Sequence, residues 1–197
     1  MQENIWNDEN LIKVLQEDGV VIMPTDTIYG MVGKAQEEFV VNRIYAIRKR
    51  NPTKPCIILI GDTEELEKFS IILTEEQKNK LKELWHISAM AEMCHERATS
   101  VVLDCPDPSL EYLHRGTNTL AFRLSTTQAL RDLLMKVGPL IAPSANLEAE
   151  PLSQNIEDAK KYFGDSVDLY IDGGTIKNKA SKLIKLHKDG SIDILRK

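Results

Sequence analysis

Short apolar runs alternate with longer amphipathic stretches along most of this sequence, and no other feature constrains the fold as strongly. Residues 20–23 (VVIM) and 56–60 (CIILI) have the length and composition of buried strands. Between them, residues 37–49 carry apolar side chains at helical spacing. The same criteria predict strands at 100–103, 120–124, 140–142, 167–171, 183–186 and 192–195, and helices at 63–69, 74–85, 126–137 and 155–163. This order predicts an α/β fold around a mostly buried sheet.

The length and composition suit one domain. The chain has 197 residues, of which 42% are hydrophobic, enough for one sizeable core or one domain with a large cleft. No internal repeat, low-complexity segment or convincing linker divides the sequence. We therefore expect a single domain over residues 1–197.

The charge balance limits the partners. With 25 basic and 30 acidic residues the formal net charge is -5, which argues against bulk, sequence-blind binding of nucleic acid but not against a local basic pocket. No apolar run is long enough to span a bilayer, and the first residues do not resemble a secretory signal. We expect a cytoplasmic protein that does not contact the membrane.

Several common site motifs are absent from the sequence. It contains no P-loop, no dinucleotide-binding glycine motif, no HExxH and no GxSxG. Three cysteines without CxxC spacing indicate neither a disulfide framework nor a cysteine zinc site. His86, Cys94 and His95 lie close together, but no second cluster completes a zinc site. We expect no metal ion held by protein side chains.

The first candidate motif is PTDTIYG at residues 24–30, directly after the strand predicted at 20–23. Ligands of open α/β sheets bind beyond the carboxyl ends of strands. The hydroxyl and carboxyl groups of Thr25, Asp26, Thr27 and Tyr29 are suited to a carboxylate, a phosphate or an amino-acid hydroxyl. Because Pro, Thr and Asp are also ordinary turn residues, a purely structural turn stays an alternative.

The second candidate is the basic run Arg48, Lys49 and Arg50, followed closely by Lys54. Guanidinium groups bind phosphate oxygens in pairs, so this run could clamp a phosphate. Cations are also mildly favourable at a helix C-terminus, and a solvated helix end is the alternative.

Two further candidates come later in the chain. Ser144 and Asn146 lie two residues apart in PSAN, on one side of an extended segment, and could hold one ligand jointly. An ordinary turn is the alternative. Arg123 lies within the apolar run LAFRLS and needs a carboxylate partner, a ligand or the exposed end of its strand.

Taken in order, PTDTIYG, IYAIRKRNPTKP, LAFRLS, GPLIAPSAN, YIDGG and the closing ASKLIKL…ILRK resemble the YrdC-type threonylcarbamoyl-AMP synthase family. The resemblance runs from about Val20 to Arg196. It implies a twisted, mixed, mostly buried sheet with flanking helices and a large concave basic cleft. It also implies a nucleotidyltransferase that makes threonylcarbamoyl-AMP and pyrophosphate from L-threonine, bicarbonate and ATP with Mg²⁺. The product feeds the threonylcarbamoyladenosine modification of tRNA, by transfer to other proteins of that pathway.

The resemblance also assigns roles to single residues. It implies catalytic cations at Arg48, Arg50 and Lys54. It implies a threonine site formed by Thr27, Tyr29, Arg123 and Ser181. It implies nucleotide contacts from Arg48, Arg50, Thr99, Thr119, Ser144, Asn146, Ser153 and Arg196. The cations would offset the repulsion between an anionic nucleophile and the triphosphate, and no nucleophilic side chain is required.

The sequence departs from the family pattern at three places. Arg48 stands where the family usually has Lys, and Ala180, Ser181 and Lys182 replace its Pro-Ser-Thr. Residues 86–99 (HISAMAEMCHERAT) replace a Pro-Gly-Pro-x-Thr turn. Of these, residues 87–98 are expected to form a short helix or a mobile lid, with Thr99 or Ser100 in place of the family Thr.

We expect that the part of the site that binds the nucleotide is remodelled and that synthase activity is retained. One alternative is a divergent relative that binds RNA or nucleotide without adenylation activity, and direct contact with tRNA is left open. The other is a carbamoyl-transfer domain, which in carbamoyltransferases of this fold is embedded in a much longer chain.

Overall fold

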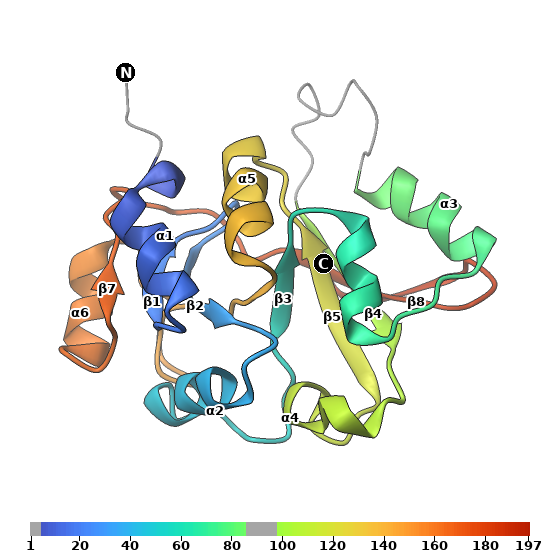
Figure 1. Ribbon diagram of the computed structural model, residues 1–197, viewed down its shortest axis with the longest axis horizontal. Helices are drawn as coiled ribbons and strands as arrows, with labels where there is room; N and C mark the ends of the chain where they lie inside the picture. The colour runs from blue at the N-terminus through green and yellow to red at the C-terminus, as the bar shows by residue number, and fades with distance from the viewer. Residues whose placement is uncertain (1–4, 86–97) are drawn as a thin grey trace.

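The computed structural model describes residues 5–85 and 98–197, and within them nine strands form one sheet in the order β7-β1-β2-β6-β3-β5-β4-β8-β9 (Figure 1). The strands are β1 Val21–Pro24, β2 Tyr29–Lys34, β3 Ile57–Ile60, β4 Thr99–Asp104, β5 Thr119–Leu124, β6 Leu140–Ile141, β7 Leu169–Tyr170, β8 Lys182–Leu186 and β9 Ile192–Arg196. The pairs β1–β7, β3–β5 and β4–β8 are parallel, and the other neighbours are antiparallel. The predicted α/β class with a mixed sheet is confirmed.

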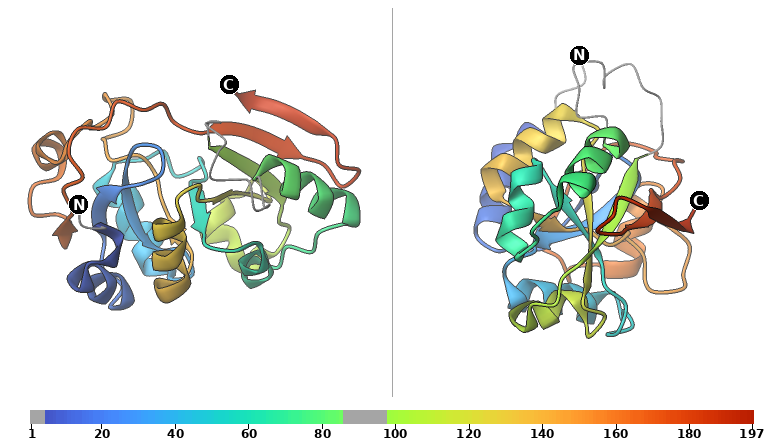
Figure 2. Two further views of the ribbon diagram at one scale, coloured as in Figure 1. Left: turned by 90° about the horizontal axis from the view of Figure 1, so that it is seen from above. Right: turned by 90° about the vertical axis from the view of Figure 1, so that its right-hand side faces the viewer.

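The helices cover both faces of this sheet. They are α1 Glu9–Gln16, α2 Glu38–Ile47, α3 Glu75–Leu84, α4 Glu111–His114, α5 Gln128–Val137 and α6 Ile156–Phe163, with 3-10 turns η1 Ile5–Asn7, η2 Thr63–Phe69 and η4 Pro108–Leu110. Side chains alternate along a strand, so Val21 and Met23 of β1 pack with α1 and α5, whereas Ile22 packs with α2 and α6. Figure 2 shows α1 and α5 on one side of the sheet. Burial on both faces explains why the strands read as continuous apolar runs.

Local capping signals place several helix ends. The hydroxyl of Thr74 accepts a hydrogen bond from Gln77 N, and Gln77 reaches back to Thr74 N, which completes a capping box at α3. Asn155 caps α6 through Asp158 N. The helix predicted at 63–69 is a 3-10 helix capped by Asp62.

One strand and two α-helices were not predicted from the sequence. Strand β2 follows β1 in a tight antiparallel hairpin, with Pro24 opposite Tyr29. The motif at residues 24–30 is therefore the turn of this hairpin plus the first residues of β2. Helix α1, which buries Leu11 and Leu15, and the short helix α4 were also missed.

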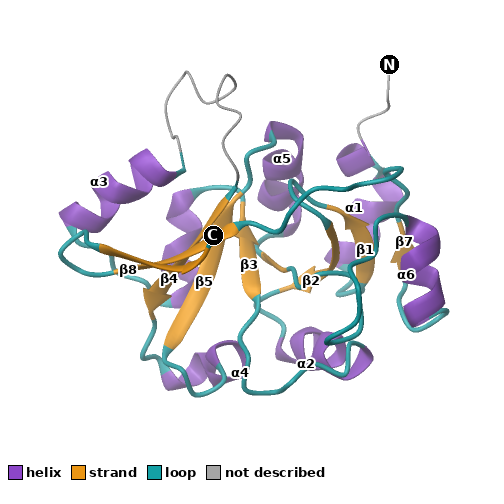
Figure 3. Cartoon of the chain, turned by 180° about the vertical axis from the view of Figure 1, so that it is seen from behind, coloured by secondary structure: helices purple, strands orange, loops and turns teal. Residues whose placement is uncertain are grey.

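A long extended connection, the crossing segment at residues 171–181, joins β7 near one edge of the sheet to β8 near the other. Figure 3 shows it passing over one face of the sheet. A Cβ added at Gly173 would lie 2.2 Å from Pro24 Cγ, so only glycine permits this close approach. The hydroxyl of Tyr29 accepts a hydrogen bond from Gly173 N (2.8 Å) and donates one to Gly174 O (2.8 Å). The β1–β2 hairpin thereby anchors the crossing segment.

Some sequence predictions fall outside the described residues. They include the helix or lid expected at residues 87–98, all of it except Ala98, and the cluster of His86, Cys94 and His95. Within 5–85 and 98–197, no helix is both long and apolar enough to cross a bilayer. Over those same residues, no group of three or more His, Cys, Asp or Glu side chains could hold a metal ion.

Candidate functional site

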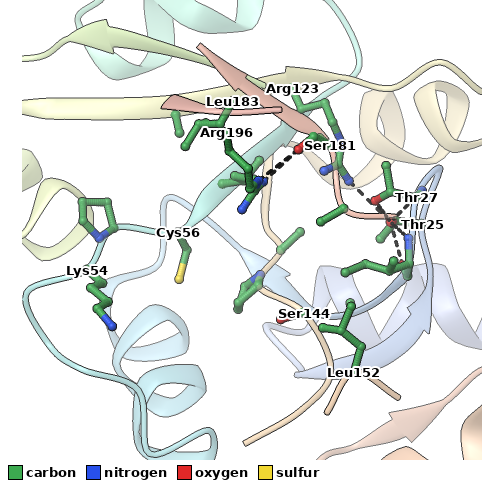
Figure 4. Close-up of a pocket in the computed structure, with 18 of the residues that line it drawn as sticks. Thr25, Thr27, Lys54, Cys56, Arg123, Ser144, Leu152, Ser181, Leu183 and Arg196 are labelled. Atoms are coloured by element: carbon green, nitrogen blue, oxygen red, sulfur yellow. Dashed lines mark hydrogen bonds between the residues drawn. The ribbon is translucent and has the colours of Figure 1, made fainter. Parts of the chain in front are cut away.

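A cavity of about 440 Å³ lies where five segments of the chain converge. Its walls come from the β1–β2 turn, the segment after α2, strand β5, the segment after β6, and the β8–β9 hairpin. Figure 4 shows Thr25, Thr27 and Arg123 on one side of this cavity and Lys54 on the opposite side. Its volume is typical of small-molecule sites.

The inner end of the cavity is built on the β1–β2 turn. Thr25 Oγ1 donates to Ile28 O (2.7 Å) and lies 3.1 Å from Thr27 Oγ1, so the two hydroxyls are held side by side. Arg123 Nη2 lies 2.9 Å from Asp26 Oδ1, an ion pair whose alignment is outside that of a hydrogen bond. It also donates to Thr25 Oγ1 at 3.4 Å.

This ion pair supplies a carboxylate partner for Arg123, which is one of the three possibilities that the sequence left open. The other carboxylate oxygen, Asp26 Oδ2, accepts a hydrogen bond from Thr126 N (3.1 Å). Arg123 is buried, and its Nε has no hydrogen-bond partner. Arg123 nevertheless lines the cavity, so its guanidinium charge acts on a ligand there.

Strand β2 brings the PSAN segment beside this end. Gly30 and Ser144 form an isolated bridge, Met31 N donates to Pro143 O (2.9 Å), and Ala145 N donates to Tyr29 O (2.9 Å). Two motifs more than 110 residues apart therefore share one wall. Ser144 lines the cavity, whereas Asn146 is buried behind it.

The mouth of the cavity is formed by the segment after α2. Arg50 donates from Nε to Lys54 O (3.1 Å) and from Nη2 to Pro55 O (2.9 Å), and both basic side chains line the cavity. Lys54 Nζ forms an ion pair with Glu148 Oε1 at 2.7 Å. Glu148 also accepts a hydrogen bond from Asn51 N. The mouth is therefore cationic, with a carboxylate beside it.

The β8–β9 hairpin supplies the remaining wall. Arg196 donates from Nε to Ser181 O (3.1 Å) and from Nη2 to Ser181 Oγ (3.3 Å), and Ser181 Oγ lies 2.8 Å from Ser100 Oγ. The pairing of β8 with β9 shifts register between Leu183 and Ile184. Such an irregularity re-aims a side chain, and Arg196 and Leu183 both line the cavity.

The cavity concentrates positive charge in an acidic chain. Among its described lining residues four are cations and none is an acid: Arg50, Lys54, Arg123 and Arg196. Cys56 also lines it, but burial raises the pKa of its thiol, so at neutral pH it is a protonated, weak nucleophile. The site is thus equipped to bind anions through charge and hydroxyl groups.

Several residues predicted for the site lie near the cavity but do not line it. Tyr29 and Arg48 are buried behind the wall. Burial raises the pKa of the Tyr29 phenol, which stays neutral and holds the crossing segment. Asn146 and Ser153 also lie behind the wall. Asn146 Nδ2 donates to Leu147 O (2.9 Å) and Glu150 O (2.7 Å), and Ser153 Oγ donates to Ala145 O.

Two predicted nucleotide contacts lie elsewhere. Thr119 begins β5, and its hydroxyl lies 3.1 Å from that of Thr117. Thr99 begins β4 and borders a different groove beside α3. Neither lines the 440 Å³ cavity.

Several residues that line the cavity were not predicted as site residues from the sequence, among them Thr25, Ile28 and Leu152. Thr25 was noted in its motif but not assigned, although its hydroxyl contacts Arg123. Ile28 and Leu152 add apolar surface. Thr25 could have been found from its position two residues before Thr27, whereas Leu152 carries no signal in the sequence.

Comparisons with known proteins point to one group. A family model named for Sua5, YciO and YrdC and described as "Telomere recombination" matches residues 13–197. A threonylcarbamoyl-AMP synthase from Pseudomonas fluorescens is 28% identical over 191 residues, which cover 96% of this chain and 97% of that protein. The threonylcarbamoyl-AMP synthase of Bacillus subtilis is 29% identical over 163 residues, which cover 82% of this chain and 44% of that protein.

A solved structure agrees with these matches. P. abyssi Sua5 complexed with L-threonine superimposes with a TM-score of 0.75 and 26% sequence identity, covering 92% of this chain and 50% of that one. The chain thus spans about half the length of the P. abyssi and B. subtilis proteins.

Proposed function

The chain belongs to the Sua5/YciO/YrdC family, and we propose that it is an L-threonylcarbamoyladenylate synthase. It would form threonylcarbamoyl-AMP and pyrophosphate from L-threonine, bicarbonate and ATP, for the threonylcarbamoyladenosine modification of tRNA. The observation that carries this proposal is a single cavity lined by four cations and several hydroxyl groups but, among the described lining residues, by no acid.

The inner end suits the amino acid. The guanidinium of Arg123, which lines the cavity, would bind the threonine carboxylate, and the paired hydroxyls of Thr25 and Thr27 would orient its hydroxyl and amine. The side chain of Ile28 offers an apolar surface for the threonine methyl group. Ser181, the last residue of the crossing segment, also lines the cavity.

The mouth suits the triphosphate. Arg50 and Lys54 lie there, Ser144 lines the same cavity, and Arg196 approaches from the β8–β9 hairpin. Because Arg50 already donates to two backbone carbonyls, its guanidinium is held in place before a ligand arrives. Such preorganised charge stabilises a transition state more than mobile charge does.

The chemistry needs positioning and positive charge. The amine of threonine takes up bicarbonate, releasing water, and becomes a carbamate. A carbamate oxygen then attacks the α-phosphorus of ATP, and pyrophosphate leaves with the electrons of the broken P–O bond. Both reactants are anionic, so the four cations would offset their repulsion and bring them into line.

Magnesium would enter with the nucleotide. Mg²⁺ prefers oxygen ligands, chiefly carboxylates and phosphates. The described residues that line the cavity offer no carboxylate, so the protein does not fit a resident ion. We treat MgATP as the substrate and assign no step to a metal ion held by side chains.

The test is pyrophosphate release by the purified chain with threonine, bicarbonate and ATP. We expect release that depends on both threonine and bicarbonate, that is lost in Arg50→Ala, and that is retained in Lys49→Gln. Lys49→Gln is the matched control, because the substitution removes one positive charge from an exposed residue next to Arg50. No threonine-dependent release at saturating ligands would overturn the proposal. Tight, salt-sensitive binding of tRNA without release would favour the RNA-binding alternative.

A further inference from the structure

Arg48 occupies an unusual place for a cation. It is the residue that caps the C-terminal end of α2, and only 2% of its surface is exposed. It does not line the cavity, although both Arg50 and Ser144 do. A fully buried guanidinium is costly unless other groups compensate its charge and satisfy its donors.

The donors of Arg48 are directed at one short segment, the anchored loop, which we define as residues 144–146. Nε donates to Asn146 O (3.0 Å), and Nη2 donates to Asn146 Oδ1 (3.2 Å) and to Ser144 Oγ (3.3 Å). Nη1 has no hydrogen-bond partner. Among the described residues no carboxylate lies within ion-pair distance of Arg48.

We infer that Arg48 is a positioning residue that holds the anchored loop so that Ser144 faces a phosphate in the cavity, without touching the ligand itself. This inference rests on the proposed function only in that the cavity binds a phosphate group. It departs from the role that sequence analysis gave to Arg48, a direct phosphate contact, because the cavity lies on the far side of Ser144.

The bond between Arg48 and Ser144 also constrains the hydroxyl. Because Ser144 Oγ accepts from Arg48 Nη2, its own hydrogen is directed elsewhere and stays available as a donor. The serine lines the cavity, so that hydrogen can reach an anionic oxygen there. Arg48 thus turns Ser144 into a donor.

The arrangement needs arginine rather than lysine. Three acceptors on one loop are reached by two nitrogens of a planar, rigid group, whereas a lysine offers a single ammonium. Lysine at this position would keep the charge but could not reproduce the three bonds. This explains why Arg48 is compatible with a binding site although lysine is usual at this place in the family.

A second contact fixes the same region from the opposite side. Glu148 N donates to Arg48 O (3.2 Å), and the Glu148 carboxylate pairs with Lys54. The segment after α2 therefore donates side-chain hydrogen bonds to the segment after β6 and accepts a backbone hydrogen bond from it.

The buried charge also links Arg48 to the contents of the cavity. Burial, and then the nearby charge of Arg50, lower the pKa of Arg48 to about 10, so it stays charged at neutral pH. An anion bound in front of Ser144 would compensate that charge. We therefore expect the buried charge of Arg48 to stabilise the form of the protein in which an anion occupies the cavity.

The experiment is calorimetric titration with inorganic pyrophosphate, which requires neither threonine nor turnover. It compares the wild type with Arg48→Lys, Ser144→Ala, the double variant and Lys49→Gln. If Arg48 acts through Ser144, each single substitution weakens binding by about tenfold. The double variant then binds no more weakly than the weaker single variant, because the two losses are not additive. Lys49→Gln stays within about twofold of wild type, as is typical of an exposed charge.

Hydrogen exchange separates positioning from a general structural role. Arg48→Lys should speed exchange at the amides of residues 144–148 and leave that of β1 and β5 unchanged. Should Arg48→Lys fail to fold, Arg48→Gln takes its place in the same comparison. Losses that multiply in the double variant, an Arg48 variant that binds like wild type, or a wild type that binds no pyrophosphate would each overturn the inference. Pyrophosphate binding with the expected coupling, but no threonine-dependent turnover, would uphold it and overturn only the proposed function.

Discussion

The two ends of the cavity each contain an ion pair, and the pairs differ in their exposure to water. At the inner end, the side chains of Arg123 and Asp26 are 5% and 0% exposed. At the mouth, those of Lys54 and Glu148 are 59% and 23% exposed. The N–O distances are similar, 2.9 and 2.7 Å.

Because they differ in exposure, the two ion pairs have different physical roles. A buried pair has fixed geometry, and removal of one partner leaves an uncompensated charge. An exposed pair is screened by water and salt and contributes little to stability, so its partners can exchange. Under the proposed function, the fixed cation lies at the end that would bind the amino acid, and the exchangeable cation lies at the end that would bind the triphosphate.

Asp26→Asn should have the largest effect on stability. It keeps an acceptor for Thr126 N but leaves Arg123 buried without a counter-charge. We expect the free energy of unfolding to fall by roughly 3–5 kcal/mol, measured by urea denaturation. The matched control is Glu148→Gln at the mouth. A loss from Asp26→Asn no greater than the control's would remove the distinction between the two ends.

Arg50→Gln should affect binding and leave stability nearly intact. Its partners Lys54 O and Pro55 O lie at the mouth, where water can replace the lost donor. We expect affinity for pyrophosphate to fall about 10- to 100-fold, as for the loss of a hydrogen bond from a charged group. Calorimetry with Lys49→Gln as control measures this. A large drop in stability with unchanged affinity would reverse the assignment of the two ends.

Tyr29→Phe tests how the inner end is connected to the crossing segment. The substitution removes the acceptor of Gly173 N and the donor to Gly174 O. We expect a loss of about 1–2 kcal/mol, since both backbone groups lie close to the surface. Hydrogen exchange should quicken at residues 172–176 but not in β1. Uniform acceleration over the sheet would mean that Tyr29 acts as a core residue alone.

Glu148→Gln should have the smallest effect, visible only as a change with pH. The hydrogen bond from Lys54, and then that from Asn51 N, hold the pKa of Glu148 below its ordinary value. A lowered pKa in the folded state stabilises the fold above the unfolded value of about 4.3, and this stabilisation disappears as the pH falls through the folded value. Melting temperatures of wild type and variant should therefore differ slightly at pH 7 and converge below pH 4. A gap that widens in acid would contradict this sign.

Much of the fold could be predicted from periodicity, because most strands are buried on both faces. Strand β2 could not, since YGMVGK contains two glycines and reads as a turn. A Cβ at Gly33 would lie 2.4 Å from Val40 Cγ1, so this glycine is required by the close packing of α2 on β2. Such tertiary contact leaves no local pattern in the sequence.

The order of motifs was enough to identify the family, but not to orient every side chain. Arg48, Lys49 and Arg50 are consecutive, yet Arg48 is buried, Lys49 is exposed with a φ of 49°, and Arg50 lines the cavity. The exit from α2 after Ile47 sets these directions. Sequence spacing does not fix where a helix ends to within one residue, and one residue decides which cation meets the ligand.

The crossing segment has a consequence for synthesis of the protein. It delivers Ser181, Leu183 and Arg196, which come later in the chain than all the other lining residues, whereas most of the apolar interior is encoded before them. The cavity wall formed by these three residues is therefore completed only at the end of translation, after most of the apolar interior has been synthesised.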